Sequence, residues 1–555
     1  MKEGYSVVRP PRQREVNLDE NVYVPMRDGA KIAVDIYRPA AQGRYPAIFS
    51  MSPYIKEIQQ RPPKLSHSIE AGATSFFVPK GYVHVIAQVR GSGFSQGRYN
   101  FFDLKEQRDG YDLVEWISRQ PWCDGNVGML GDSYFAMIQY LVAAEKPPHL
   151  RCIVPFDGMT DLYRNMCYQG GLFRSGFLSN WGVDLLCQCL WPGPVAGKLP
   201  PANFIVDVAS RPHDGPYYWT RSAWKKIDKI NVPMLNISVQ HGSQHALGQL
   251  NSYPRIKAPK KLLVVPPAKE GHIFFLQSKP LNEQILRWFD YWLKGIATGI
   301  MEEPAVAIFD TGTGAWRYEN EYPLLRTKWT KFYLRSNPAQ PSTTPPYGFL
   351  TLDTPKDEAP DRFRIPDSID QILAGQPVLA YTTAPLREDL RLWGPLSATL
   401  YGSSTTNLDT VWVVKLHDIA PDGKVTLLTQ GHLKASHREV DRSKSKPGQP
   451  FHPYRRSLLP EANRVYEYQI ELRPLFHTFK AGHTISVYIA GDDPAYHAAL
   501  RTTYTYEVLT VPSESSLYHD SANPSHLLLP VIPEAPIICP VRPPLSKIKW
   551  GASAQ

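Results

Sequence analysis

The sequence has little cysteine and no long apolar run. Six cysteines in 555 residues are too few for a disulfide framework, and their spacing fits neither a zinc ribbon nor a zinc finger. No apolar stretch approaches the ~18 residues that cross a bilayer. The first residues are polar and lack the apolar core of a signal peptide. We therefore expect a cytoplasmic protein that binds no membrane.

The sequence also lacks a concentrated charge. Lys and Arg total 61 against 52 for Asp and Glu, so the net charge of +9 is modest for this length. The densest basic cluster, residues 437–446, carries acids and lies between strand-like runs, which favours a loop over a nucleic-acid patch. His241 and His245 lie four residues apart, but no carboxylate or thiolate is near enough in sequence to complete a metal site. We predict no nucleic-acid partner, no metal and no cofactor, and the sequence carries no signal for an oligomeric state.

The residues that are abundant indicate a folded, loop-rich chain. Hydrophobic residues make up 43% of the sequence, enough to fill sizeable cores. The 52 prolines are nearly double the usual ~5% and are scattered, which is typical of many turns. At roughly 150 residues per domain, the length suggests three or four domains.

Hydrophobic patterns divide the chain into an α/β part and an all-β part. The predicted strands of the first part cover 31–37, 45–51, 82–89, 125–131, 234–239 and 261–265, and its predicted helices cover 106–119, 135–144 and 286–293. This alternation predicts a parallel sheet with crossover helices. An aromatic-rich stretch without strand periodicity interrupts it and is interpreted as a helical insertion. Beyond about residue 320, short alternating runs predict an antiparallel sandwich or jelly roll.

A short motif in the α/β part points to nucleophilic catalysis. Gly131-Asp132-Ser133-Tyr134-Phe135 follows a predicted buried strand and opens a predicted helix. A nucleophile elbow needs this context, because a strained strand-to-helix turn presents the serine. The usual Gly-x-Ser-x-Gly pattern is broken, since Phe135 occupies the last glycine position.

The residues around this motif resemble the cocaine esterase and X-prolyl dipeptidyl-peptidase family of acyl hydrolases. The segments that carry the resemblance are 22–29, 35–39, 90–97, 120–134, 289–295, 394–397, 418–423 and 477–483. The resemblance implies an α/β-hydrolase fold with an inserted helical cap and a C-terminal jelly-roll β-sandwich. We expect the hydrolase domain at 1–157 and 229–320, the cap at 158–228 and the jelly roll at 321–555.

The resemblance also implies the roles of individual residues. It makes Ser133 the nucleophile and His272 the general base. The backbone N–H of Tyr134 and the hydroxyl of Tyr54 would then hold the oxyanion.

The acid of the expected triad is missing from its usual place. An aspartate should follow the strand 234–239, but no Asp or Glu occurs from Lys229 to Lys269. Three explanations are open. In the first, Asp157 supplies the acid, because it lies just after the strand that follows the elbow helix. In the second, Ser133 and His272 act as a weaker dyad, oriented by a neutral group. In the third, the pocket no longer hydrolyses its substrate and steers a cyclisation, isomerisation or acyl transfer.

Two further groups of residues complete these expectations. The neutral groups that could orient the histidine are Gln240, Ser243 and Gln244. Gln88 is a second departure, because the family usually has aspartate before its Arg-Gly turn, here Arg90-Gly91.

Aromatic residues of the insertion are expected to line an apolar cleft above Ser133. Such a cleft favours a small hydrophobic ester or acyl substrate over a charged peptide. The sequence therefore predicts a serine hydrolase or acyltransferase that works through an acyl-enzyme at Ser133. The alternative is a non-hydrolytic biosynthetic cyclase or isomerase on the same fold.

Overall fold

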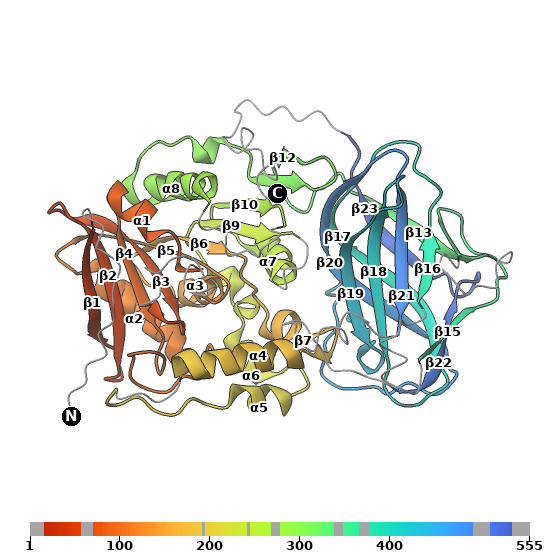
Figure 1. Ribbon diagram of the computed structural model, residues 1–555, viewed down its shortest axis with the longest axis horizontal. Coiled ribbons are helices and arrows are strands. Elements are labelled where there is room, and N and C mark those ends of the chain that lie inside the picture. Colours follow the sequence, from red (N-terminus) through yellow and green to blue (C-terminus); the bar gives the residue numbers. More distant parts are fainter. Residues whose placement is uncertain are drawn as a thin grey trace.

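A computed structural model describes residues 16–56, 70–190, 195–240, 245–267, 278–337, 348–365, 378–491 and 511–534. Figure 1 shows an α/β body beside a β body, and the chain passes from the first to the second after strand β12. Within the described residues, no helix is long and apolar enough to cross a membrane.

The α/β body is built on a ten-stranded sheet with the order β1-β2-β4-β3-β5-β6-β9-β10-β11-β12. Its strands are β1 (Val16–Pro25), β2 (Lys31–Pro39), β3 (Tyr45–Ser52), β4 (Val83–Gln88), β5 (Cys123–Asp132), β6 (Leu150–Phe156), β9 (Met234–Val239), β10 (Lys260–Val265), β11 (Val306–Asp310) and β12 (Ala315–Glu319). The strands from β4 to β11 are parallel, and the outer pairs are antiparallel. The predicted parallel sheet and α/β-hydrolase fold are confirmed.

Helices cover both faces of this sheet, so its central strands are apolar on both sides. The main helices are α2 (Leu104–Ser118), α3 (Tyr134–Glu145) and α8 (Lys279–Lys294), with a short α1 (Thr74–Phe77). The side chains of neighbouring residues in a strand point to opposite faces of the sheet. Met129 packs in the core that includes residues of α2 and α3, whereas Leu130 packs in the core that includes residues of α8.

Helix α8 differs from the prediction at its start only. The expected helix 286–293 is its second half, and it ends as expected at Gly295, which has φ 69°. Its first turns are polar and contain Pro280, a residue that the first turn of a helix tolerates. The apolar pattern alone therefore missed them.

The insertion between β6 and β9 is mostly helical. It contains α4 (Ser175–Leu185), α5 (Phe204–Ala209), α6 (Pro216–Arg221) and the turns η4 (Leu162–Cys167), η5 (Leu186–Leu190), η6 (Ala223–Lys225) and η7 (Ile227–Lys229). A short hairpin, in which β7 (Tyr168–Gln169) pairs with β8 (Leu172–Phe173), was not predicted. Gly170 and Gly171 form its turn with φ of 59° and 82°, which glycine adopts without strain. After β9 come α7 (Ala246–Ser252) and the turn η8 (Tyr253–Arg255).

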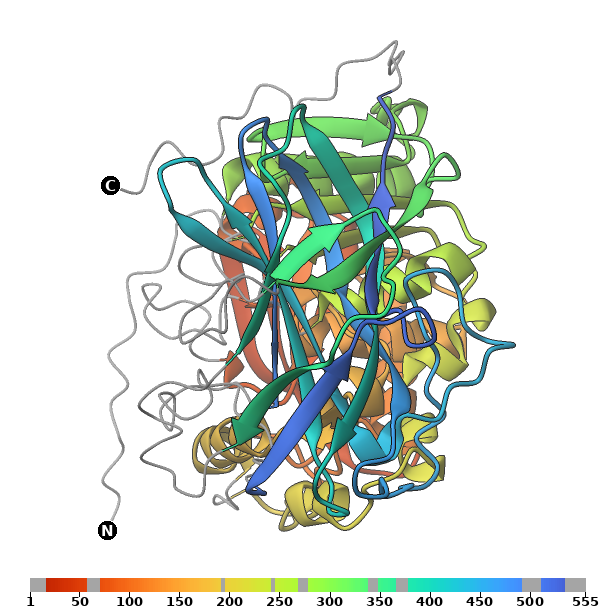
Figure 2. The same ribbon diagram turned by 90° about the vertical axis from the view of Figure 1, so that its right-hand side faces the viewer.

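The β body is an eleven-stranded, almost entirely antiparallel β-sandwich. It faces the viewer in Figure 2, with the α/β body behind it. Its strands are β13 (Lys328–Ser336), β14 (Gly348–Thr351), β15 (Asp361–Ile365), β16 (Leu379–Thr382), β17 (Leu390–Ser404), β18 (Val411–Ile419), β19 (Val425–Lys434), β20 (Tyr466–Phe479), β21 (Thr484–Ala490), β22 (Ser513–Tyr518) and β23 (His526–Val531). This confirms the predicted all-β C-terminal part.

Buried polar contacts fix the two bodies against each other. Asp310, at the end of β11, accepts hydrogen bonds from the Trp393 indole N–H at 3.1 Å and from the Thr478 backbone N–H at 3.2 Å. Asn251 of α7 donates to Glu471 of β20 at 2.8 Å. Helix α7 therefore touches both the hydrolase sheet and the sandwich.

Candidate active site

Ser133 lies at a strained turn between β5 and α3. Its φ is 56° and its ψ −115°, a conformation that a residue other than glycine rarely adopts. The Ser133 backbone N–H donates to the carbonyl of Phe156 at 3.1 Å, which ties the turn to the end of β6. Ser133 is half-buried, whereas α3 behind it is almost completely buried. The turn therefore presents the serine at the carboxyl edge of the sheet.

Phe135 replaces the last glycine of the usual motif without opening the turn. A Cβ atom on Gly131 would lie 2.3 Å from the Cβ of Phe135, so the first glycine is required. The Phe135 ring lies 6.0 Å from the ring of Tyr54. The larger residue thus packs beneath the site.

The backbone of Tyr134 is at the first position of α3. An N–H at this position has no acceptor within the helix, and the helix dipole adds partial positive charge there. Its side chain is anchored elsewhere: the hydroxyl donates to Glu106 Oε1 at 2.7 Å, and the ring stacks on Phe102 at 4.0 Å. These side-chain contacts hold the first turn of α3 in place.

Tyr54 follows β3 and is buried beside the elbow. Its hydroxyl accepts a hydrogen bond from the Trp181 indole N–H at 3.1 Å, so this bond does not use the hydroxyl's own proton. Burial, and then the nearby Glu70 carboxylate, raise the pKa of Tyr54 well above its usual value. The side chain is therefore a neutral hydrogen-bond donor at neutral pH.

Gln88 joins the Arg-Gly turn to Tyr54. Its Oε1 accepts from the Phe94 backbone N–H at 2.9 Å, and its Nε2 lies 3.5 Å from the carbonyl of Tyr54. An amide makes both contacts because it carries a donor and an acceptor, which an aspartate at this position would not. The departure at residue 88 thus has a local structural role.

Asp157 follows β6 and contacts His245; its predicted partner, His272, lies outside the described residues. Its Oδ2 lies 3.1 Å from His245 Nδ1, and both side chains are buried. The Asp157 backbone N–H donates to the carbonyl of Ile237 at 2.7 Å, which fixes its place beside β9. Because the Ser133 backbone N–H bonds to the preceding residue, Phe156, the backbone of Asp157 begins next to the elbow.

His245 lies between β9 and α7, where the acid of the triad was expected. From the sequence, His245 was considered only as a metal ligand, and that role was rejected. Its position after a central strand was the signal that could have indicated a role at this edge of the sheet. His272, Ser243 and Gln244 lie outside the described residues. Gln240 donates to the carbonyl of Phe309 on β11, so its amide nitrogen is bonded to the backbone of that strand. Among the described residues, no cluster of three or more His, Cys, Asp or Glu side chains could hold a metal ion.

The carboxyl of Asp132 lies beside this pair. Burial raises the pKa of Asp132 well above its usual range, and the charges of Glu70 and Asp157 raise it further. Burial therefore favours the protonated form of this carboxyl, which precedes the serine in the chain.

The aromatic residues of the insertion divide into two groups. Trp181 is buried above the elbow, where it stacks on Phe177 at 6.0 Å and on Tyr134 at 6.3 Å. Tyr163 instead stacks on Tyr168 at 5.1 Å and belongs to the core of the insertion. The first group gives the surroundings of Ser133 an apolar, aromatic character.

The buried Glu106 predicts a pH-dependent stability. Burial raises the pKa of Glu106 to about 8, whereas an unfolded glutamate titrates near 4.3. Between these values the folded state binds the extra proton, so this group's contribution to the free energy of unfolding falls as pH rises from about 4.5 to about 8. In the unchanged protein, Glu106 should lower the free energy of unfolding by on the order of a few kcal/mol over that range. Glu106→Gln should lack this decrease. Urea unfolding of both proteins at about pH 5 and pH 8 measures it, and equal decreases in the two would contradict it.

Comparisons with known proteins agree with this fold. Residues 28–269 match the model of the X-Pro dipeptidyl-peptidase (S15 family), and residues 298–528 match that of the X-Pro dipeptidyl-peptidase C-terminal non-catalytic domain. A cocaine esterase from Rhodococcus sp. is 27% identical over 92% of this chain and 98% of its own. A CocE/NonD family hydrolase from Staphylococcus aureus has a TM-score of 0.83 at 22% identity, covering 94% of each chain. An α-amino acid ester hydrolase has a TM-score of 0.71 at 17% identity, covering 95% of this chain and 99% of its own.

Proposed function

Because the chain belongs to the cocaine esterase and X-prolyl dipeptidyl-peptidase family of serine hydrolases, we propose that it forms an acyl-enzyme at Ser133. The acyl donor is a small hydrophobic ester or a related acyl compound. The observation that carries the proposal is the φ of 56° at Ser133, between a buried strand and the N-terminus of α3. The aromatic surroundings of Trp181 support the apolar acyl group.

The reaction proceeds by two acyl transfers. The Ser133 oxygen attacks the carbonyl carbon while its proton passes to an imidazole, and the carbonyl oxygen becomes an oxyanion. The Tyr134 N–H and the Tyr54 hydroxyl donate hydrogen bonds to that oxyanion. Its collapse breaks the ester bond, and the leaving alcohol takes the proton from the imidazole. Water, or a second nucleophile, then attacks the acyl-enzyme by the same route and frees Ser133.

We assign the imidazole to His245. A carboxylate at Nδ1 fixes the tautomer of a catalytic histidine and stabilises its charged form, which leaves Nε2 for the serine. The contact of Asp157 with His245 Nδ1 at 3.1 Å supports this arrangement. The family resemblance assigns the same role to His272, which stays a prediction, and variants of the two histidines distinguish the assignments.

A slowly hydrolysed acyl group tests the proposed function. A p-nitrophenyl carbamate should inactivate the protein with release of one p-nitrophenolate per site, because carbamoyl-enzymes of serine hydrolases hydrolyse slowly. Peptide mass spectrometry should then find the carbamoyl group on Ser133. Inactivation that modifies another residue, or turnover of the ester with no acylated Ser133 under acid quench, would contradict the mechanism.

Removing the hydroxyl of Tyr54 should slow the chemical step. We expect Tyr54→Phe to lower kcat by about 10²–10³ with little change in KM, because a single oxyanion donor contributes this much in the transition state. Steady-state kinetics with a p-nitrophenyl ester measure both constants. Trp181→Phe is the matched control: it removes the hydrogen bond to Tyr54 but keeps the oxyanion donor, so its kcat should fall far less. An unchanged kcat in Tyr54→Phe would exclude the hydroxyl from the oxyanion site.

A further inference from the structure

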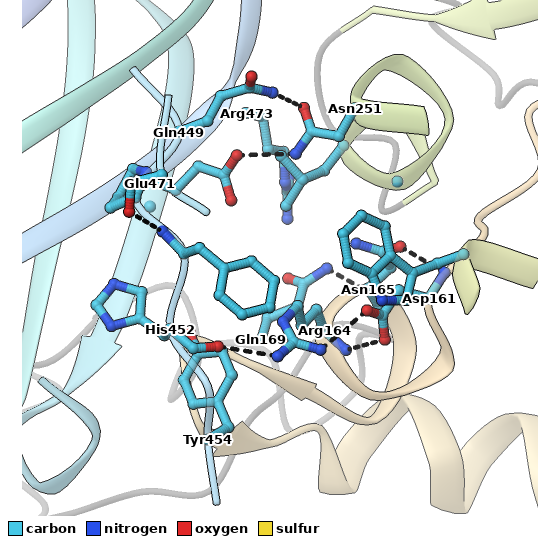
Figure 3. Close-up of a pocket in the computed structure, with 18 of the residues that line it drawn as sticks. Asp161, Arg164, Asn165, Gln169, Asn251, Gln449, His452, Tyr454, Glu471 and Arg473 are labelled. Carbon is cyan, nitrogen blue, oxygen red and sulfur yellow. Dashed lines mark hydrogen bonds and ion pairs between the residues drawn. The ribbon is translucent and has the colours of Figure 1, made fainter. Parts of the chain in front are cut away.

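A cavity lies between the two bodies of the protein, and Ser133 is not among the residues that line it. Its volume is about 400 Å³, and its walls come from η4, α7, strands β19 and β20, and the loop at 443–454. Figure 3 shows side chains from the α/β body and from the sandwich pointing toward this cavity. The residues that line it do not include Ser133, Tyr54, Asp157 or His245.

Most charged groups of the cavity wall are already neutralised by the protein. Arg164 pairs with Asp161 at 3.0 Å and with Asp214 at 2.8 Å, and Arg255 pairs with Asp228 at 2.6 Å. These groups have a structural role and little charge to offer a ligand.

Two groups of opposite charge on β20 lack such a pairing. Glu471 and Arg473 are two residues apart, so their side chains lie on the same face of the strand, and both line the cavity. Asn251 binds Oε1 of Glu471, and within the described part of the chain Oε2 has no hydrogen-bond partner. Across the same residues, the Arg473 guanidinium makes no ion pair or hydrogen bond, not even with Glu471. Figure 3 shows the Glu471 carboxyl beside Asn251, with Arg473 next to them.

Burial makes Glu471 responsive to a cationic ligand. It raises the pKa of Glu471 to about 7, because a single amide is its main hydrogen-bond donor and Arg164 offsets the burial only partly. A positive group bound at Oε2 would restore the stabilisation that the buried carboxylate lacks.

The wall of the cavity also contains aromatic side chains. Trp224 and Phe451 lie nearly parallel, with ring centroids 6.0 Å apart and an interplanar angle of 28°. The Arg164 guanidinium lies over the Phe451 ring at 4.8 Å, and that of Arg255 lies over the Trp224 ring at 4.4 Å. Leu247 and Leu433 add apolar surface to the same cavity.

We propose that this cavity binds a small zwitterion, an α-amino acid with an apolar or aromatic side chain. Its carboxylate pairs with Arg473 and its ammonium group with Glu471. Its side chain packs against Phe451 and Trp224. A single ligand that carries both charges can pair with Glu471 and Arg473, which form no ion pair with each other among the described residues. The volume of the cavity suits a molecule of this size.

Calorimetric titration with L-phenylalanine at about pH 8, where Glu471 is ionised, tests the proposal. The full-length protein should bind it saturably, with one site per chain. Phenylacetate lacks the ammonium group and phenethylamine lacks the carboxylate, so each should bind at least about tenfold more weakly. Absence of saturable binding would overturn the proposal, and so would equal affinity for phenylacetate, because Glu471 would then make no contact.

Variants locate the binding in this cavity. Glu471→Gln and Arg473→Gln should each weaken L-phenylalanine binding by at least about tenfold, whereas Glu467→Gln and Arg442→Gln should not. Glu467 and Arg442 serve as matched controls because both are outside the cavity wall, and Glu467 lies on the same strand. Retained binding in Glu471→Gln would overturn the proposal. Turnover of a p-nitrophenyl ester should continue in all four variants, which separates a failure here from a failure at Ser133.

Discussion

Ser133→Ala is expected to lower kcat/KM for ester hydrolysis by a factor of about 10⁴ or more. The acyl-enzyme cannot form without the serine oxygen, and the oxyanion donors alone retain only a small part of the catalysis. Alanine and serine have similar φ preferences, so the substitution adds no backbone strain at this turn. The thermal unfolding temperature should therefore change little. Hydrolysis of a p-nitrophenyl ester measures the loss.

A surface serine provides the control for this variant. Ser210 lies at the end of α5 and is exposed, so Ser210→Ala should keep the activity of the unchanged protein. If Ser133→Ala still converts the natural substrate at the original rate, the acyl-enzyme is excluded. That outcome would favour a cyclisation or isomerisation that uses the site for its shape and hydrogen bonds.

Asp157→Asn and His245→Gln are expected to have the second-largest effects, each lowering kcat by about 10³–10⁴. Asparagine keeps the shape of the side chain but loses the charge that fixes the histidine tautomer. Because the two residues act as a unit, the double variant should be about as slow as either single variant. Steady-state kinetics of the three variants form the test.

His272→Gln decides which histidine receives the proton. We expect its kcat to fall much less than that of His245→Gln. The opposite order would assign the base to His272 and leave the Asp157–His245 pair with a structural role. Additive losses in Asp157→Asn and His245→Gln would show that the two residues do not act together.

Most of the central strands of the α/β body could be predicted because parallel strands are buried on both faces, whereas β1, β11 and β12 towards the edges of the sheet were missed. The central strands appear in the sequence as short apolar runs between turn residues, and β9 has the predicted bounds, Met234–Val239. The β7–β8 hairpin was missed because its strands are two residues long and carry no measurable alternation. The polar first turns of α8 were missed because only its second half has a clear apolar pattern.

The turn at Ser133 could be predicted because its strand, turn and helix are continuous in the chain. The role of Ser133 as the nucleophile stays a prediction. The contact between Asp157 and His245 joins residues 88 positions apart, and it depends on the register of β6 against β9. The hydrogen bond from Trp181 to Tyr54 spans 127 positions and depends on how the insertion folds back. Sequence patterns do not encode such distant contacts.

Labelling with a fluorophosphonate probe tests the central claim most directly, because it reports the nucleophile and its activation without knowledge of the substrate. The probe should modify the protein at one residue, and peptide mass spectrometry should locate it on Ser133. Ser133→Ala should not be labelled, and His245→Gln should be labelled far more slowly. Labelling at another residue, or a folded protein in which Ser133 does not react, would contradict the acyl-enzyme mechanism.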